Sequence, residues 1–239
     1  MDSLKLRGKN ISYLPGTLRE VQNIKMYFED NNITVTTFVG KAATETSVKS
    51  ISNQNTSILH IATHGFYYTE PRANKENDLH FMIHSSDDNR YLEERMLTRS
   101  GLLFAGANKT LKGIDIPLGN DDGILTALEI SQLDLRNVNL VVLSACETGT
   151  GEIAQGEGVF GLQRGFKKAG VKSILMSLWD VNDITTEMLM TEFYKNICEG
   201  KSKRESLRLA QKKVREYRDP DGIFLFQDPQ YWAGFILLD

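Results

Sequence analysis

Apolar residues recur every three to four positions in several parts of the chain, which is the spacing of an amphipathic helix. This pattern predicts helices at residues 17–30, 44–51, 158–169, 183–199 and 202–217. Thr17 is expected to cap the first of these helices. Basic side chains on the last one are expected to form a solvated face.

Short runs of β-branched and apolar residues between these helices predict strands. They fall at residues 33–39, 57–63, 79–84, 101–106, 138–145 and 173–178. The run at 138–145 is almost continuously apolar, as expected for a strand that helices cover on both faces. A helix separates it from 173–178, and strands joined in this way lie parallel. The pattern therefore predicts an α/β fold with a mostly parallel central sheet.

Length and composition indicate one domain over residues 1–239. The chain has 41% hydrophobic residues, enough for one sizeable core. Its formal charge of −3 favours neither nucleic acid nor an anionic membrane as a partner. No apolar run reaches the roughly 18 to 20 residues of a membrane span, and no signal peptide is recognisable. We expect a cytoplasmic protein, in which the two cysteines remain thiols.

Two residues that suit nucleophilic catalysis follow two of the predicted strands. His64 comes directly after the strand 57–63, and Cys146 directly after 138–145. Ligands of open parallel sheets bind beyond the carboxyl ends of the strands, so both residues are expected at one rim. An imidazole can take the proton of a thiol and later protonate a leaving amine. The backbone N–H groups of Gly65 and Cys146 could stabilise the oxyanion.

These residues and the loop after Cys146 also allow structural, metal-binding and phosphate-binding interpretations. Cys146 alone could be a buried structural thiol, the usual state of an unpaired cysteine. His60 and His64 are four positions apart, but on a strand they lie too far from each other to share a metal ion. The loop at 149–158 lacks the Gly-Lys-Ser/Thr of a phosphate-binding loop. We expect no metal and no cofactor.

Several segments carry a resemblance to a known family. They include a Leu-Pro-Gly-Thr segment, two segments that contain His64 and Cys146, and a Leu-Trp-Asp-Val segment. In order, they lie at residues 14–20, 58–66, 100–108, 143–149, 177–183 and 231–235. Together they resemble CHAT domains, which are caspase-like peptidases of the caspase and separase clan and are often fused to tetratricopeptide repeats. The resemblance covers nearly the whole chain in the family's order.

The resemblance implies a caspase-like αβα sandwich in which His64 and Cys146 form the catalytic dyad. It also implies Gly65 and Cys146 as oxyanion donors and places the loop from Trp179 to Glu187 near the substrate. The substrate-binding residues expected there are Trp179, Asp180, Asp183 and Glu187. Asp183 could instead cap the helix that follows. The acids favour a basic or uncharged residue before the scissile bond.

These observations predict a cysteine endopeptidase that cleaves a specific protein substrate and is regulated by an attached or partner domain. The chain shows no tetratricopeptide repeats, so we expect it to be the C-terminal catalytic part of a longer protein. Two alternatives remain open. One is a non-catalytic interaction module with the same fold, and the other is a small-molecule hydrolase or transferase that uses the same dyad.

Overall fold

A central four-stranded sheet organises the protein. The computed structural model describes residues 11, 14–67, 94, 97–117, 119–144, 157–179 and 181–239. Neighbouring strands follow the order β1 (Ile58–Ile61), β5 (Leu140–Leu143), β6 (Ser173–Ser177) and β7 (Phe235–Leu238). The first three strands are parallel, and β7 pairs antiparallel with β6. The predicted mostly parallel sheet is confirmed.

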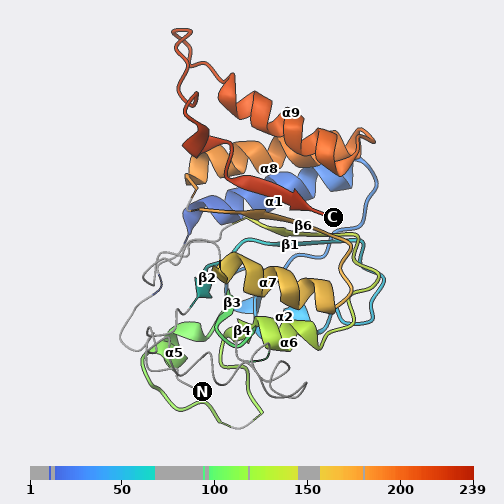
Figure 1. Ribbon diagram of the computed structural model, residues 1–239, viewed down its shortest axis with the longest axis vertical. Coiled ribbons are helices and arrows are strands. Elements are labelled where there is room, and N and C mark those ends of the chain that lie inside the picture. Colours follow the sequence, from blue (N-terminus) through green and yellow to red (C-terminus); the bar gives the residue numbers. More distant parts are fainter. Residues whose placement is uncertain are drawn as a thin grey trace, which may run out of the picture.

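Helices cover both faces of this sheet (Figure 1). The helices are α1 (Pro15–Asp30), α2 (Glu45–Lys49), α5 (Ala107–Leu111), α6 (Ala127–Ser131), α7 (Glu157–Lys168), α8 (Asp183–Cys198) and α9 (Lys203–Arg215), with single turns η2 (Gly40–Ala42) and η3 (Pro229–Tyr231). Helices α1, α8 and α9 lie on one side, and α6 and α7 lie on the other (Figure 1). This is the arrangement of a caspase-like αβα sandwich.

Alternate residues of β5 belong to two different cores. Val141 packs into the core formed with α6 and α7, whereas Val142 packs into the core formed with α1, α8 and α9. Both side chains are fully buried. Each therefore contributes on the order of 1.5 to 3 kcal/mol through burial. A strand with two covered faces explains why the run at 138–145 is continuously apolar.

A second, antiparallel sheet lies beside the α7 side of the molecule (Figure 1). Its order is β2 (Gly65–Tyr67), β3 (Ser100–Leu103) and β4 (Ile124–Thr126). Gly101 lies at its centre, where an added Cβ would come within 2.6 Å of the Leu125 carbonyl oxygen and of the Phe66 ring. Only glycine allows β2 and β4 to approach β3 this closely. Because β2 begins directly after His64, this sheet helps to position the candidate site.

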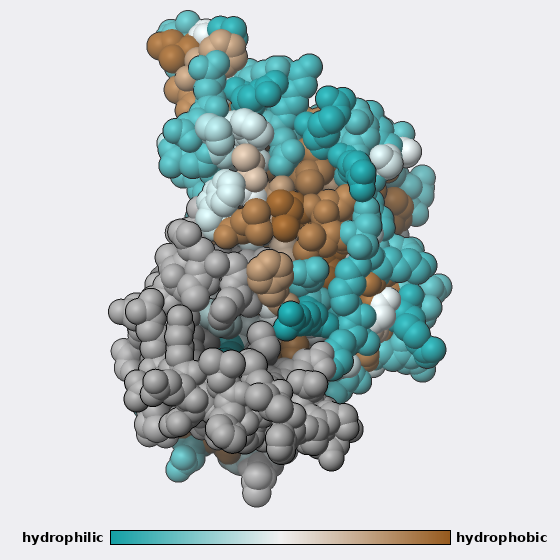
Figure 2. All heavy atoms as spheres, viewed as in Figure 1, coloured by the Kyte–Doolittle hydropathy of each residue, from teal (hydrophilic) through white to brown (hydrophobic). Residues whose placement is uncertain are grey.

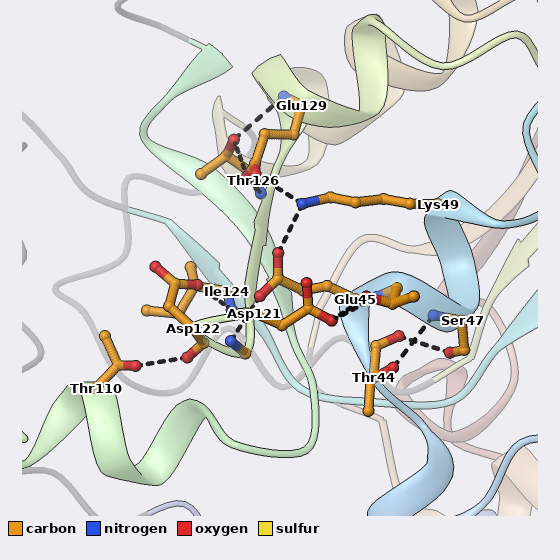
Figure 3. Close-up of polar contacts among 12 residues, drawn as sticks. Thr44, Glu45, Ser47, Lys49, Thr110, Asp121, Asp122, Ile124, Thr126 and Glu129 are labelled. Atoms are coloured by element: carbon orange, nitrogen blue, oxygen red, sulfur yellow. Dashed lines mark hydrogen bonds and ion pairs between the residues drawn. The ribbon is translucent and has the colours of Figure 1, made fainter. Parts of the chain in front are cut away.

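Helix α2 is joined to the second sheet through a buried carboxylate (Figure 3). One oxygen of Glu45 accepts a hydrogen bond from the Gly123 N–H at 2.6 Å, and the other accepts one from Lys49 Nζ at 2.9 Å. Lys49 also donates to Glu129 at 3.1 Å. Burial raises the pKa of the Glu45 carboxyl, although both donors oppose the increase. Burial alone would lower the pKa of Lys49, but the hydrogen bonds to the two carboxylates raise it.

Two local predictions were wrong. Residues 33–39 form no strand, and Ile33, Phe38 and Val39 are exposed, because no neighbouring strand pairs with this segment among the described residues. Helix α1 begins at Pro15, so Thr17 lies in its first turn, where its hydroxyl donates to the Leu14 carbonyl at 2.8 Å. A proline at the start of a helix needs no N–H partner, which explains the earlier beginning. The predicted strand at 79–84 lies outside the described residues.

The basic helix α9 behaves as the pattern indicated. Ser202 caps it by accepting a hydrogen bond from the Glu205 N–H. Its apolar side chains, Leu207, Ala210 and Val214, are buried against the core. Figure 2 shows hydrophilic side chains over this helix and an apolar tip on the loop that projects beyond it, where Ile223 and Leu225 are exposed.

Candidate functional site

The ends of β1 and β5 meet at one rim of the central sheet. Ile61, the last residue of β1, lies opposite Leu143, the last residue of β5. The next residue, Ser144, donates its N–H to the Ile61 carbonyl at 3.1 Å. The two strands therefore stay in register up to the point where each chain leaves the sheet. His64 and Cys146 follow these ends by three positions each.

His64 is held by its own backbone between the two sheets. Its carbonyl accepts a hydrogen bond from the Leu103 N–H at 2.9 Å. The preceding residue, Thr63, donates its hydroxyl to the Leu103 carbonyl. Both contacts anchor the turn between β1 and β2 to β3. His64 is partly exposed.

Gly65 opens β2 and is buried. It lies opposite Leu102 of β3 in the antiparallel pair. A glycine next to the histidine permits close approach of a substrate backbone. Its role as an oxyanion donor stays a prediction, as does that of Cys146. Cys146 lies outside the described residues, which end in this part of the chain at Ser144.

Trp179 lies just beyond the carboxyl end of β6, on the same edge of the sheet as the ends of β1 and β5. Its indole N–H donates to the Gln230 carbonyl at 3.2 Å. A Cβ added to Gly234 would lie 3.1 Å from the indole, so the ring packs directly on the backbone that enters β7. Trp179 as a whole is 39% exposed. Trp179 is thus a partly exposed aromatic residue at the rim, and its contacts with Gln230 and Gly234 fix the position of its ring.

Two of the three acidic residues predicted to contact substrate, Asp183 and Glu187, are among the described residues, and both lie against α1. Asp180 lies outside the described residues. Asp183 is exposed at the start of α8 and lies against Gly16 of α1. The cap of α8 is Asn182, whose side-chain oxygen accepts hydrogen bonds from two backbone N–H groups, so Asp183 is not the cap.

The Glu187 side chain contacts two residues of α1. Its carboxylate accepts hydrogen bonds from Arg19 at 2.9 Å and from Asn23 at 3.3 Å. These three residues line a groove between α1 and α8. Because Arg19 already compensates its charge, Glu187 is a weaker candidate for recognising a basic substrate side chain than the sequence suggested.

A buried polar cluster behind the rim was missed by the sequence analysis. His60 Nδ1 lies 2.9 Å from the Tyr194 hydroxyl, and His60 Nε2 lies 3.1 Å from Glu20 Oε1 and 3.3 Å from Ser144 Oγ. The sequence placed His60 on a strand, too far from His64 to share a metal ion, and indicated no further role for it. One signal was present: Glu20 precedes Ile24 by four positions, so it lies on the buried face of α1.

Two further searches concern the described residues alone. None of their helices is long and apolar enough to span a membrane. Their histidine, cysteine, aspartate and glutamate side chains form no group of three or more that could hold a metal ion.

The fold and the histidine at the strand end define a protein of the caspase-like α/β class. Comparison with known proteins names the family. Residues 2–238 match the family model described as "CHAT domain". Since the match covers nearly the entire chain, the protein belongs to the CHAT domain family.

One relative is similar over part of the chain. Over 115 residues, the sequence is 32% identical to tetratricopeptide repeat protein 28 of Homo sapiens. The matched region is 48% of this chain but 4% of that protein, so the chain corresponds to a small part of its relative.

Proposed function

We propose that this chain is a caspase-like cysteine endopeptidase in which Cys146 is the nucleophile and His64 the general base. The observation that carries the proposal is the parallel register of β1 and β5, maintained to the hydrogen bond between Ser144 and Ile61. Two segments more than eighty residues apart in sequence leave the sheet side by side. Membership of the CHAT family supports the same assignment.

The proposed reaction follows the chemistry of a thiol and an imidazole. His64 takes the thiol proton of Cys146 as the sulfur attacks the carbonyl carbon of the scissile peptide bond. The N–H groups of Gly65 and Cys146 stabilise the oxyanion that forms. The imidazolium then protonates the leaving amine, and the acyl-enzyme remains. A water molecule, deprotonated by His64, hydrolyses the thioester and restores the thiol.

We also propose that the substrate is a specific protein, with a basic or uncharged residue before the scissile bond. The partly exposed Trp179 and the acids that follow it in the sequence, Asp180 and Asp183, support this preference, while Glu187 contributes less because Arg19 binds it. The name of the human relative supports regulation by tetratricopeptide repeats, either attached or on a partner. A cytoplasmic location remains part of this proposal.

A cleavage assay with labelled protein termini tests the proposal. Cells that express the protein together with its partner domain should produce new N-termini, and both Cys146→Ala and His64→Ala should abolish them. Ser206→Ala is a matched control, because Ser206 is a buried serine on α9, away from the rim. Cleavage that survives the Cys146 substitution contradicts the mechanism. Absence of any cleavage, with an unreactive Cys146, favours a non-catalytic interaction module.

A further inference from the structure

The polar cluster around His60 connects four elements at the rim of the sheet. His60 comes from β1, Glu20 from α1, Tyr194 from α8, and Ser144 from the end of β5. Ser144 is two positions before Cys146 in the sequence. The cluster therefore reaches the strand that leads to the proposed nucleophile.

The cluster is buried, so the free-energy cost of removing its polar groups from water must be offset by other interactions. The side chains of His60 and Glu20 are 11% and 3% exposed, and Ser144 and Tyr194 are 0% exposed. Among the described residues, Glu20 Oε1 accepts no well-aligned hydrogen bond, although His60 Nε2 lies 3.1 Å from it. Burying a carboxylate costs several kcal/mol unless it is paired. Apolar side chains would fill this space at lower cost, so packing alone does not explain the cluster.

The hydrogen bonds of His60 indicate which of its two ring nitrogens carries the proton. Burial, together with the charge of Glu20, raises the pKa of the Tyr194 hydroxyl well above its ordinary value. Tyr194 therefore keeps its proton and can donate it to His60 Nδ1. An imidazole that accepts at Nδ1 carries its proton on Nε2, where the Ser144 hydroxyl is the aligned partner at 3.3 Å and Glu20 Oε1 lies 3.1 Å away. The ring is also fixed by an edge contact with Tyr194, with 5.5 Å between the ring centroids.

Ser144 is therefore fixed by two hydrogen bonds, one from its backbone and one at its side chain. Its N–H donates to the Ile61 carbonyl, and its hydroxyl lies at the His60 ring. In β5, Leu140 and Val142 pack into the core formed with α1, α8 and α9, and Ser144 continues this alternation. The last described residue before Cys146 is thus fixed in both backbone and side-chain direction.

We propose that Glu20, His60 and Tyr194 are positioning residues that act through Ser144 on Cys146. This inference rests on the proposed function, because it assumes that Cys146 works with His64. An error of about 1 Å in the position of a reacting group can cost about 100-fold in rate. Loosening the strand end by removing one contact is expected to lower the reactivity of Cys146 by about tenfold.

Site-resolved alkylation of the full chain with iodoacetamide tests the inference without a known substrate. Peptide mass spectrometry gives separate rates for Cys146 and Cys198. Cys198 is a suitable internal reference, because burial raises the pKa of its thiol and it lies on α8, outside the cluster. The rate of Cys146 relative to Cys198 is measured from pH 5 to 10, and the midpoint of that profile is recorded with the melting temperature.

Three variants each change one member of the cluster with little change of volume. Glu20→Gln removes the buried charge, and Tyr194→Phe and Ser144→Ala each remove one hydroxyl. Ser206→Ala is the control. Its hydroxyl is as deeply buried as that of Ser144 but has no hydrogen-bond partner among the described residues. His60→Leu and His60→Gln form a rescue pair, since the glutamine amide can restore a donor near the position of Nε2.

The inference predicts that the three variants slow Cys146 about tenfold and raise the midpoint of its pH profile, while Ser206→Ala changes neither. His60→Gln should recover part of the rate lost in His60→Leu. All variants should remain folded at the assay temperature.

A different result separates the two proposals. If wild-type Cys146 is fast and depends on His64, but the three variants stay within twofold of Ser206→Ala, the positioning role is wrong and the proposed function stands. If wild-type Cys146 is no faster than Cys198 and His64→Ala has no effect, both proposals fail.

Discussion

Removing the cation that pairs with the buried Glu45 should destabilise the fold in a pH-dependent way. Of the donors among the described residues, Glu45 would keep only the Gly123 N–H in Lys49→Met. Breaking a buried ion pair costs about 3 to 5 kcal/mol, whereas an exposed pair contributes about 0 to 1 kcal/mol. Lys49 is 36% exposed and Glu45 is 3% exposed at the side chain, so an intermediate loss of about 2 kcal/mol is expected at pH 7.

The sign of the pH dependence follows from the raised pKa of Glu45. A carboxyl whose folded-state pKa is raised contributes its stability below the unfolded pKa and loses it as the pH rises through the folded value. Lys49 opposes this increase, so removing it raises the pKa of Glu45 further. The deficit of Lys49→Met should therefore be largest at neutral pH and shrink as the pH falls toward about 4.

Urea unfolding followed by circular dichroism measures the effect. With a slope of about 3 kcal/mol per molar urea, the midpoint should fall by about 0.7 M at pH 7. Glu45→Gln in the Lys49→Met background should recover most of the loss, because it removes the buried charge. Lys25→Met is the control, since Lys25 and Glu29 form an exposed pair of the same spacing. A pH-independent loss, or a loss no larger than that of the control, would refute the reasoning.

Two further predictions concern the second sheet and the groove. Gly101→Ala should destabilise the fold by about 1 to 3 kcal/mol in urea, because its Cβ would overlap the Leu125 carbonyl and the Phe66 ring; unchanged stability would contradict the close packing. Arg19→Ala should cost less than about 1 kcal/mol, and less still in 1 M salt, because its pair with Glu187 is exposed on the arginine side; a larger, salt-independent loss would show that the pair stabilises more than its exposure implies.

The central sheet was predictable because its signals are local. The continuous apolar run of β5 identifies a strand with two covered faces, and Ser202 and Thr44 both cap the helices that follow them. Residues 33–39 have the same β-branched character but form no strand. Strand formation needs a partner backbone, and the composition of a segment does not show whether one is present.

The candidate site was predictable only in part, for a related reason. The position of His64 after a parallel strand follows from the order of elements. The cluster of Glu20, His60, Tyr194 and Ser144 does not, because its members come from four elements and meet only in three dimensions. Likewise, the ion pair of Glu187 with Arg19 could not be predicted, because the two residues lie 168 positions apart in the sequence.

The central claim is that the sulfur of Cys146 and the imidazole of His64 share one site at the rim of the sheet. The most direct test is the distance between Cys146 Sγ and the nearest ring nitrogen of His64 in a crystal structure of the full chain. We expect about 3 to 6 Å, since resting dyads are often looser than working ones. A sulfur buried in apolar packing, or on a different face of the molecule from His64, would contradict it.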